Sequence, residues 1–377
     1  MRRILVLEPY DGGSHARFLN DLARQFPNDH FERMSLPARS WKWRMRFAAI
    51  EFAKRCRELD DGGAAFDFII ASTFINLAEF RALAPAAIGA LPSILYFHEN
   101  QLAYPNQVAD KRDVHFGITN IIAALAATRL VFNTRYNLDS FLGAIPDLIR
   151  KAPDMDLGFV LEELCQKSNV FPVPLDLDLE PSLVAARSQD ASPIVVWNHR
   201  WEHDKAPEAF FQALFALADQ GLDFRVAVAG QNFEHRPKIF DEAKARLGPR
   251  ICQWGAVKTR VDYLELLRRS TVCVSTALHE FQGLSVLEAA AQGCHLVLPD
   301  RLSYPELFPS LARYDNRPGL ERMLNEILSR RPAVDEALVE RAREFAWSQW
   351  RPVYDRFFEE LAPDSLNPPR EEPPKSS

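Results

Sequence analysis

Two glutamates, Glu280 and Glu288, are separated by seven residues that include one glycine, Gly283. The apolar run 271–276, typical of a buried strand, precedes them, and an alanine-rich amphipathic segment ending at Gly293 follows. The spacing predicts Glu280 in a strand-to-helix loop and Glu288 about one and a half turns into the helix. Free amides at a helix start favour phosphate, whereas carboxylates accept hydrogen bonds from hydroxyls. The pattern therefore favours a sugar nucleotide, with amides for its diphosphate and one glutamate for each sugar.

Two cations, Arg200 and Lys205, follow an earlier apolar run, 194–197. In open parallel sheets, ligands bind in the loops at the carboxyl edge of the strands, which is where both cations and Glu280 are expected. Fixed positive charge there would neutralise a departing diphosphate. An ordinary solvated loop would explain the two cations alone. Because Glu280 and Glu288 are expected at the same edge, we favour the functional interpretation of the two cations.

In the first half, a glycine pair follows the first predicted strand, within Asp11-Gly12-Gly13-Ser14-His15. Paired glycines let a ligand approach the backbone and leave amides free. The segment is not a G-x-G-x-x-G fingerprint. A tight turn capped by Ser14 explains it equally well.

A second polar group, His98-Glu99-Asn100-Gln101, directly follows the apolar run 94–97. At the end of a core strand, His98 is placed to bond a substrate hydroxyl or orient a leaving group. The alternative is a histidine whose bonds are satisfied inside the protein.

The segment 39–57 is basic and aromatic, although the whole chain carries a net charge of −6. Such mixtures suit a phosphate backbone and stacked bases, but an amphipathic helix with a solvated basic face is an alternative. Its members are Arg39, Trp41, Lys42, Trp43, Arg44, Arg46, Phe47, Lys54, Arg55 and Arg57.

Metal, membrane and export signals are weak. The acidic pairs Asp154/Asp156 and Asp176/Asp178 follow no clear strand, so no metal is expected. The five cysteines lack CxxC spacing, which fits buried thiols in a reducing compartment. No apolar run is long enough to span a membrane, and the apolar run 4–7 is too short for a signal peptide. We expect a cytoplasmic enzyme without stable membrane insertion.

Strands and helices alternate along the chain, which predicts βα units and parallel sheets in two α/β halves. A segment of little periodicity, 169–192, is the expected junction, 334–361 is expected to be helical, and the tail from 363 disordered. Strands are expected at 4–7, 68–71, 94–97, 130–133, 194–197, 224–229, 252–254, 272–276 and 295–298, and helices at 15–25, 41–57, 113–127, 206–220, 237–247, 261–269 and 283–292.

The second half resembles glycosyltransferase family 4, retaining enzymes of the GT-B fold, in its Glu280-x7-Glu288 motif preceded by Arg200 and Lys205. The resemblance implies that Glu280 contacts the transferred sugar and Glu288 the ribose. Arg200 and Lys205 would bind the diphosphate, assisted by the amides of Gly283, Leu284 and Ser285.

The first half resembles the tRNA-queuosine α-mannosyltransferase family. The motifs are Glu8-x-Tyr10-Asp11-Gly12-Gly13-Ser14-His15, the cluster 41–46, and Tyr96-Phe97-His98-Glu99-Asn100-Gln101-Leu102-x-Tyr104-Pro105. The family implies transfer of mannose from GDP-mannose to queuosine in a tRNA anticodon, with His98 near the donor sugar and no metal.

The resemblance also implies two facing Rossmann-like domains with a deep cleft: an acceptor domain (1–172), a donor domain (173–345) and a helix crossing back (346–362), before the tail 363–377. Gly12 and Gly13 are expected at the donor. Acceptor candidates are Ser14, His15, Asn100, Gln101, Arg39, Lys42, Arg44 and Arg46.

Three alternatives remain at this stage. A family 4 enzyme with another nucleotide sugar and a lipid or glycan acceptor would share the motifs of the second half, and its basic helix would face a membrane. A sugar-nucleotide epimerase of the same fold would need no macromolecular acceptor. A non-catalytic tRNA-binding module would keep the basic segment without needing the donor residues. The donor base and sugar and the oligomeric state are left open.

Overall fold

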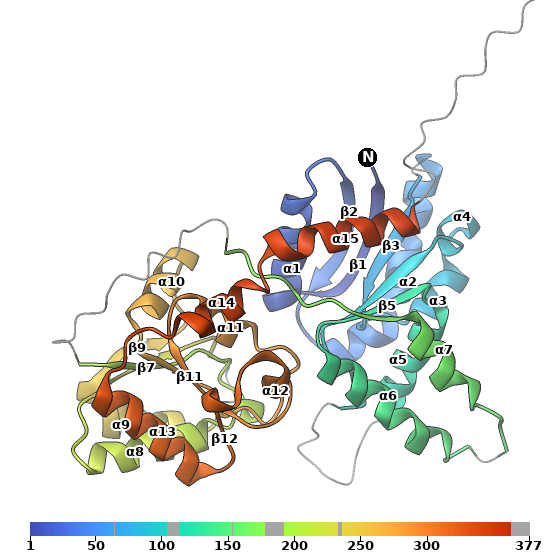
Figure 1. The fold of residues 1–377 in the computed structure, drawn as a ribbon. Coiled ribbons are helices and arrows are strands. Elements are labelled where there is room, and N and C mark those ends of the chain that lie inside the picture. Colours follow the sequence, from blue (N-terminus) through green and yellow to red (C-terminus); the bar gives the residue numbers. More distant parts are fainter. Residues whose placement is uncertain (64, 104–113, 153, 178–191, 233–235, 363–377) are drawn as a thin grey trace, which may run out of the picture. The chain divides into compact units, whose positions relative to one another are not determined.

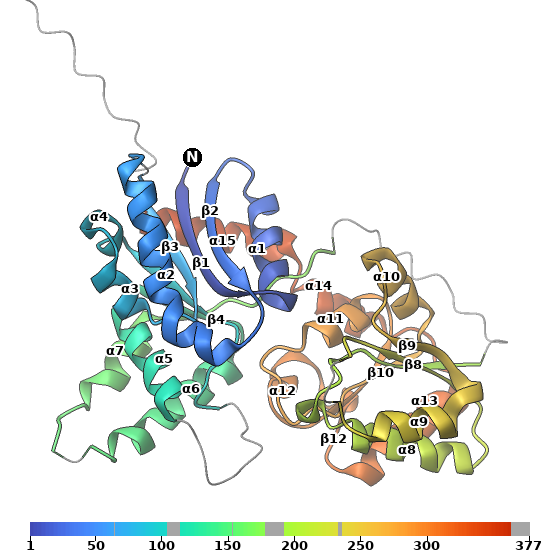
Figure 2. The same cartoon turned by 180° about the vertical axis from the view of Figure 1, so that it is seen from behind.

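The computed structural model describes residues 1–63, 65–103, 114–152, 154–177, 192–232 and 236–362. The chain forms two compact units, one of residues 1–172 with 348–377 and one of Val173–Trp347. The motif residues Tyr104 and Pro105, Asp178 of the second acidic pair, and the tail 363–377 lie outside the described residues. Each unit is built on one parallel sheet (Figures 1 and 2).

The sheet of the first unit has the strand order β2-β1-β3-β4-β5-β6. Apolar side chains at 0–4% exposure fill the centre of β1 and β3, as expected for strands covered on both faces. The order reverses between β1 and β3, which places a switch point there, where ligands bind in open α/β sheets. The strands are β1 (Arg3–Asp11), β2 (His30–Pro37), β3 (Phe68–Ser72), β4 (Ser93–Phe97), β5 (Arg129–Phe132) and β6 (Ser168–Val170).

Helices cover this sheet, and the last helix, α15, packs onto the same unit (Figure 1). The Tyr354 hydroxyl donates to the carbonyl of Pro172 at 3.0 Å, and the Phe358 ring lies 5.3 Å from that of Phe68. The helices of the unit are α1 (Gly13–Gln25), α2 (Trp41–Asp61), α3 (Leu77–Leu83), α4 (Ala86–Gly89), α5 (Val114–Ala126), α6 (Arg135–Ile149), α7 (Phe159–Lys167) and α15 (Trp347–Leu361).

The sheet of the second unit has the order β12-β11-β10-β7-β8-β9. Alternate strand residues enter two cores: Val195 and Trp197 lie in one, Val196 in the other. The order reverses between β7 and β10, so the switch point lies beside the loops that follow these two strands. The strands are β7 (Ile194–Trp197), β8 (Arg225–Ala229), β9 (Ile251–Gly255), β10 (Val272–Val274), β11 (His295–Pro299) and β12 (Arg313–Tyr314).

The helices of the second unit pack on both faces of its sheet. They are η1 (His203–Lys205), α8 (Pro207–Asp219), α9 (Ile239–Leu247), η2 (Gly248–Arg250), α10 (Arg260–Arg269), α11 (Leu284–Ala291), α12 (Tyr304–Leu307), η3 (Ser310–Ala312), α13 (Arg317–Arg330) and α14 (Glu336–Arg343).

The predicted α/β class with parallel sheets is confirmed, and every predicted strand corresponds to an observed one. The expectation of continuous helix over 334–361 is wrong. The chain forms α14 and α15 there, because the backbone around Ala346 leaves the helix and bridges Leu175 instead.

Candidate active site

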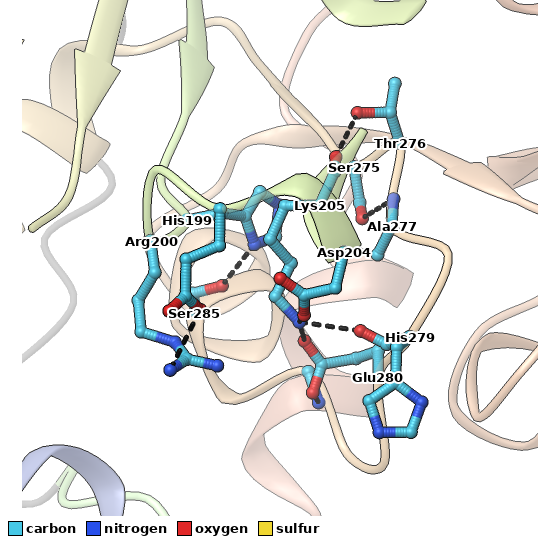
Figure 3. A network of polar contacts seen from close by, with 12 residues as sticks. His199, Arg200, Asp204, Lys205, Ser275, Thr276, Ala277, His279, Glu280 and Ser285 are labelled. Atoms are coloured by element: carbon cyan, nitrogen blue, oxygen red, sulfur yellow. Dashed lines mark hydrogen bonds and ion pairs between the residues drawn. The ribbon is translucent and has the colours of Figure 1, made fainter. Parts of the chain in front are cut away.

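Two loops of the second unit meet at its switch point. One follows β7 and ends in the short helix η1, and the other runs from Ser275 to Gly283 after β10 (Figure 3). The Thr276 hydroxyl donates to the Lys205 carbonyl at 2.8 Å, and the Leu278 amide donates to the Asp204 carbonyl at 2.8 Å. These bonds fix the two loops to each other and so preorganise the charged side chains that they carry.

A buried lysine joins the loops electrostatically. Lys205 Nζ donates to the His279 carbonyl at 2.6 Å and lies 3.3 Å from Glu280 Oε2 and 3.2 Å from Asp204 Oδ2 (Figure 3). Burial disfavours the ammonium, yet the Glu280 and Asp204 carboxylates raise the pKa of Lys205. The lysine is therefore a fixed positive charge with two anions beside it.

Glu280 also closes the turn that begins α11. Its Oε1 accepts from the Gly283 amide at 3.0 Å, and Gly283 has φ +77°, a conformation that favours glycine. Burial alone would raise the pKa of Glu280, but the Lys205 ammonium and the Gly283 amide lower it to about 2. Glu280 is thus a carboxylate throughout the physiological range.

The expected amides at the start of α11 are only partly available. The Gly283 amide is used by Glu280, which corrects the expectation that it faces a ligand. Within the described residues, the amides of Leu284 and Ser285 have no hydrogen-bond partner. Two donors therefore remain at this helix N-terminus, where the helix dipole favours an anion.

The other predicted cation, Arg200, has a different environment. Its side chain is 49% exposed and pairs with Glu202 at 3.0 Å. The positive charge of Arg200 acts to lower the pKa of Lys205, against the effect of the two carboxylates. Arg200 therefore stands in the same loop as Lys205 as a solvated cation rather than a buried one.

Two buried histidines, His199 and His279, lie beside Lys205 (Figure 3). Burial and then the Lys205 charge lower the pKa of each to about 4. Both imidazoles are therefore neutral at pH 7, whereas in the unfolded chain they titrate near 6.5.

These histidines predict a loss of stability in acid. The unfolded chain binds more protons between pH 6.5 and 4, so the free energy of unfolding falls as pH falls through that window, by on the order of 2 kcal/mol per histidine at pH 5. Denaturant melts at pH 7 and pH 5 measure the drop. His279→Gln should remove about half of it, and an unchanged drop in that variant would contradict the assignment.

Glu288 lies on α11 but pairs with a cation of its own. Its Oε1 is 2.8 Å from Arg260 Nη1, and its side chain is only 5% exposed. The Arg260 guanidinium lies over the Tyr263 ring at 5.4 Å, and the Tyr263 hydroxyl accepts from Asn198 at 2.9 Å. Glu280 and Glu288 are thus held by different cations, Lys205 and Arg260.

Sequence reasoning missed Arg260, because it begins a separate helix far from Glu288 in the chain. It also missed Gly230, where an added Cβ would stand 1.9 Å from the His199 carbonyl oxygen. No local signal marks Arg260. The glycine directly after the apolar run 225–229 is a signal that could have marked Gly230.

In the first unit, a buried carboxylate organises the switch point between β1 and β3. Glu8 is 2% exposed and accepts from the Tyr10 amide at 2.9 Å and the Ser72 hydroxyl at 3.0 Å. Its other oxygen lies 3.0 Å from His15 Nδ1. Glu8 was not among the predicted site residues, although a carboxylate that follows the apolar run 4–7 is a visible signal.

The His15 and His98 rings lie against each other, with centroids 4.0 Å apart and planes tilted by 36°. Burial opposes the charged form, but the Glu8 carboxylate raises the pKa of His15. Burial and the neighbouring His15 lower the pKa of His98 well below its usual value. The Glu8 carboxylate thus favours the charged form of His15, whereas His98 is kept neutral, at the carboxyl edge of this sheet.

Within the described part of the chain, Glu8, His15 and His98 also form a group whose ligand atoms lie within 4.8 Å of one another. The two Glu8 oxygens are already used by protein groups: one accepts from the Tyr10 amide and the Ser72 hydroxyl, and the other pairs with His15 Nδ1.

The remaining candidates of the first unit divide into exposed and internal residues. Gly12 precedes α1, and Gly13 and Ser14 are exposed in its first turn. Asn100 is fully buried, and its side-chain amide donates to Asn137 at 2.8 Å. Its hydrogen bonds therefore stabilise the loop, which corrects the expectation that Asn100 contacts the acceptor substrate. Gln101 is half-buried and donates to Glu99 at 3.1 Å.

The basic segment 39–57 begins just before α2 and covers most of that helix. Arg39, Lys42 and Arg46 are exposed, whereas Arg44 is half-buried and donates to the Pro37 carbonyl at 3.3 Å. The acidic pair Asp154 and Asp156 is exposed. Among the described helices, none combines the length and apolar character needed to cross a bilayer.

Comparison with solved structures shows the fold. A sucrose-phosphate synthase from Thermosynechococcus elongatus superposes with a TM-score of 0.67 at 13% identity, covering 96% of this chain and 100% of that one. HepE from Anabaena with UDP-glucose gives 0.67 at 15% identity, with the same coverage. Two Rossmann-like parallel-sheet units of this kind, with a glycosyl transferases group 1 match over residues 192–310, define a GT-B glycosyltransferase.

Sequence comparison gives the family. The model for the tRNA-queuosine alpha-mannosyltransferase N-terminal region matches residues 3–175. The tRNA-queuosine alpha-mannosyltransferase of Drosophila melanogaster is 33% identical over 328 residues, covering 85% of both chains. A GDP-mannose-dependent alpha-(1-6)-phosphatidylinositol dimannoside mannosyltransferase of Mycobacterium tuberculosis is 31% identical over 186 residues, 46% of this chain and 48% of that one. The chain belongs to the tRNA-queuosine alpha-mannosyltransferase family, which confirms the resemblance, and is an enzyme of the hexosyltransferase class.

Proposed function

We propose that the enzyme transfers mannose from GDP-mannose to the cyclopentenediol of queuosine in a tRNA anticodon, with retention of configuration. The observation that carries the proposal is the Lys205–Glu280 network at the second switch point, beside the free amides that begin α11. It occurs in a chain that matches a tRNA-queuosine mannosyltransferase over 85% of its length.

The donor is assigned to the second unit. Lys205, the exposed Arg200 and the amides of Leu284 and Ser285 would hold the diphosphate. Glu280 would accept hydrogen bonds from the transferred sugar. Glu288 would accept from the ribose hydroxyls, and in doing so would share its carboxylate with Arg260.

The acceptor is assigned to the first unit. Ser14 is exposed in the first turn of α1, and the charged form of the neighbouring His15 is favoured by Glu8. A diol oxygen that bonds to His15 would receive a charge-assisted hydrogen bond. His98, kept neutral by its surroundings, can bond a sugar hydroxyl, and Gly12 and Gly13 would let a ligand approach the backbone.

The transfer balances without a metal. The bond between the mannose anomeric carbon and the diphosphate oxygen breaks, and a bond to the acceptor oxygen forms on the same face. The acceptor proton passes to the departing diphosphate oxygen. Lys205, Arg200 and the helix amides stabilise the negative charge that develops there, which is the role a metal ion takes elsewhere.

Donor choice and metal independence are tested together by thermal melting. GDP-mannose at a hundred times its Kd should stabilise the protein by about 2.7 kcal/mol, through mass action. We expect EDTA to change neither this shift nor the transfer rate. A shift with UDP-sugars and none with GDP-mannose would overturn the donor assignment, and loss of transfer on chelation would overturn the metal-independent one.

The acceptor is tested by incubating the full chain with GDP-mannose and queuosine-containing tRNA, then measuring nucleosides by mass spectrometry. Queuosine should gain one hexose. The match to a phosphatidylinositol dimannoside mannosyltransferase supports one alternative, a lipid acceptor. Hexose transfer to phosphatidylinositol mannosides with none to tRNA would favour that alternative.

A further inference from the structure

One face of α2 exposes large apolar side chains to solvent. Trp43 is 66% exposed, Phe47 55% and Ile50 54%. Large exposed aromatics gathered at one place are unusual on a monomer surface and mark interaction sites. The opposite side of the helix, including Phe52 at 0% exposure, belongs to the core of the first unit, which leaves this face unpartnered.

The aromatic pair is arranged as a stack. The Trp43 and Phe47 rings lie with centroids 5.7 Å apart and planes 11° from parallel. They are one helical turn apart, so their alignment follows from the i, i+4 spacing on the helix surface. A further planar ring can extend such a stack without any rearrangement of the helix.

Cations surround this pair. Lys42, Arg46 and Lys54 are exposed on the same helix, and none of them forms an ion pair with a described residue. Arg46 lies over the Phe116 ring at 4.9 Å. The face therefore combines unneutralised positive charge with stacked rings, in a chain whose net charge is −6. Its charge complements a polyanion.

The face is too narrow for a lipid surface. Each residue of an α-helix turns the chain by about 100°, so Ile50, Trp43 and Phe47 cover an arc of roughly 60° on the helix surface. Lys54 falls inside that arc. The apolar stripe of a helix that buries one face is wider, about 100° or more. Single-stranded nucleic acid needs no more than this, because stacking platforms combine a few aromatic rings with nearby cations.

We propose that the α2 face, formed by Lys42, Trp43, Arg46, Phe47, Ile50 and Lys54, binds the tRNA acceptor by stacking its unpaired bases on Trp43 and Phe47. The cations contact the adjacent phosphates. This inference rests on the proposed function, in which the acceptor is a tRNA. Of the expected contacts Arg39, Lys42, Arg44 and Arg46, the face keeps Lys42 and Arg46. Arg44 is half-buried, and Arg39 precedes the helix.

Binding of an unmodified tRNA transcript to the full chain tests the stacking. The double variant Trp43→Ala with Phe47→Ala should weaken the Kd for the transcript about tenfold or more, since each stacked base contributes strongly. The same variant should raise the KM for tRNA and leave the thermal shift by GDP-mannose unchanged. Phe159→Ala, which removes another exposed aromatic of the first unit (55% exposed), is the matched control and should bind normally.

Conservative variants separate stacking from apolar contact. Trp43→Phe should keep most of the affinity, whereas Trp43→Leu should lose it. Lys42→Ala with Lys54→Ala should reduce the slope of log Kd against log salt by about 1.4, and the aromatic double variant should leave that slope unchanged.

Two results would overturn the inference by itself, and a third would overturn it together with the proposed function. In one, wild-type protein transfers hexose to tRNA and the aromatic double variant binds the transcript equally well, so that this inference fails and the proposed function stands. In the other, Trp43→Leu matches wild type and the chain binds phosphatidylglycerol vesicles through this face, which makes it a membrane surface. If wild-type protein neither binds nor modifies tRNA, the proposed function fails as well.

Discussion

Replacing Glu280 with glutamine is expected to lower the rate of mannosyl transfer by about a hundredfold or more while the protein stays folded. Glutamine keeps an oxygen that can accept from the Gly283 amide, so the turn that begins α11 can persist. It removes the negative charge beside Lys205 and turns one acceptor of sugar hydroxyls into a donor. Transfer rate, melting temperature and donor-induced shift should be measured on the same preparation.

Alanine is the less informative replacement, because Glu280 has two structural roles. Glu280→Ala would remove both the acceptor for the Gly283 amide and one of the two carboxylates that lie beside buried Lys205. Losing one hydrogen bond of this kind alone costs about 1 kcal/mol. A poorly active alanine variant could therefore reflect a displaced loop.

Asp204→Asn is the matched comparison for Glu280→Gln, because Asp204 contacts the same ammonium at nearly the same distance. If Glu280 acts only by holding Lys205, the two variants should lose activity equally. We expect Glu280→Gln to be at least tenfold slower, since Glu280 is the one assigned to the sugar. Undiminished transfer by Glu280→Gln would remove Glu280 from the catalytic site.

The sequence predicted the strands that are buried on both faces, because apolar runs such as 68–71 have few other uses. It did not predict β2, β6 or β12. β2 is a half-buried edge strand with charges at Glu32 and Arg33, and β6 and β12 are only three and two residues long. None of these patterns differs from that of an ordinary loop, since the pairing that makes them strands comes from neighbours elsewhere in the chain.

The candidate site was also only partly predictable from the sequence. The proximity of Lys205 and Glu280 could be predicted, because loops after parallel strands share one edge of a sheet. The sequence did not indicate that Gly283 is bonded to Glu280, that Asn100 is used internally, or that Arg260 holds Glu288. Each of these depends on side-chain directions or on a long-range pairing, and residue type and local spacing are silent on both.

Glu8→Gln is expected to lower the rate of transfer at pH 7.5, because the charged fraction of His15 falls by up to about tenfold for each pKa unit that His15 loses. Burial opposes the imidazolium and the Glu8 carboxylate restores it, so without that charge the pKa of His15 falls. In the wild type, the stabilisation from this pair is fully present below the unfolded value of 6.5 and is lost as pH rises through the raised folded pKa. The alkaline limit of the rate profile should therefore move to lower pH in the variant.

Ser72→Ala separates this electrostatic role from a structural one. Ser72 donates to the Glu8 oxygen that also accepts from the Tyr10 amide, and it forms no hydrogen bond with His15 in the described structure. Its loss should lower the melting temperature slightly and leave the pH–rate profile unmoved. If Glu8→Gln likewise lost stability with an unshifted profile, Glu8 would serve only to join β1 and β3. Both variants perturb the Glu8 carboxylate, but only Glu8→Gln removes the negative charge that pairs with His15. If Glu8→Gln shifts the pH–rate profile and Ser72→Ala does not, the charge on His15 takes part in the transfer.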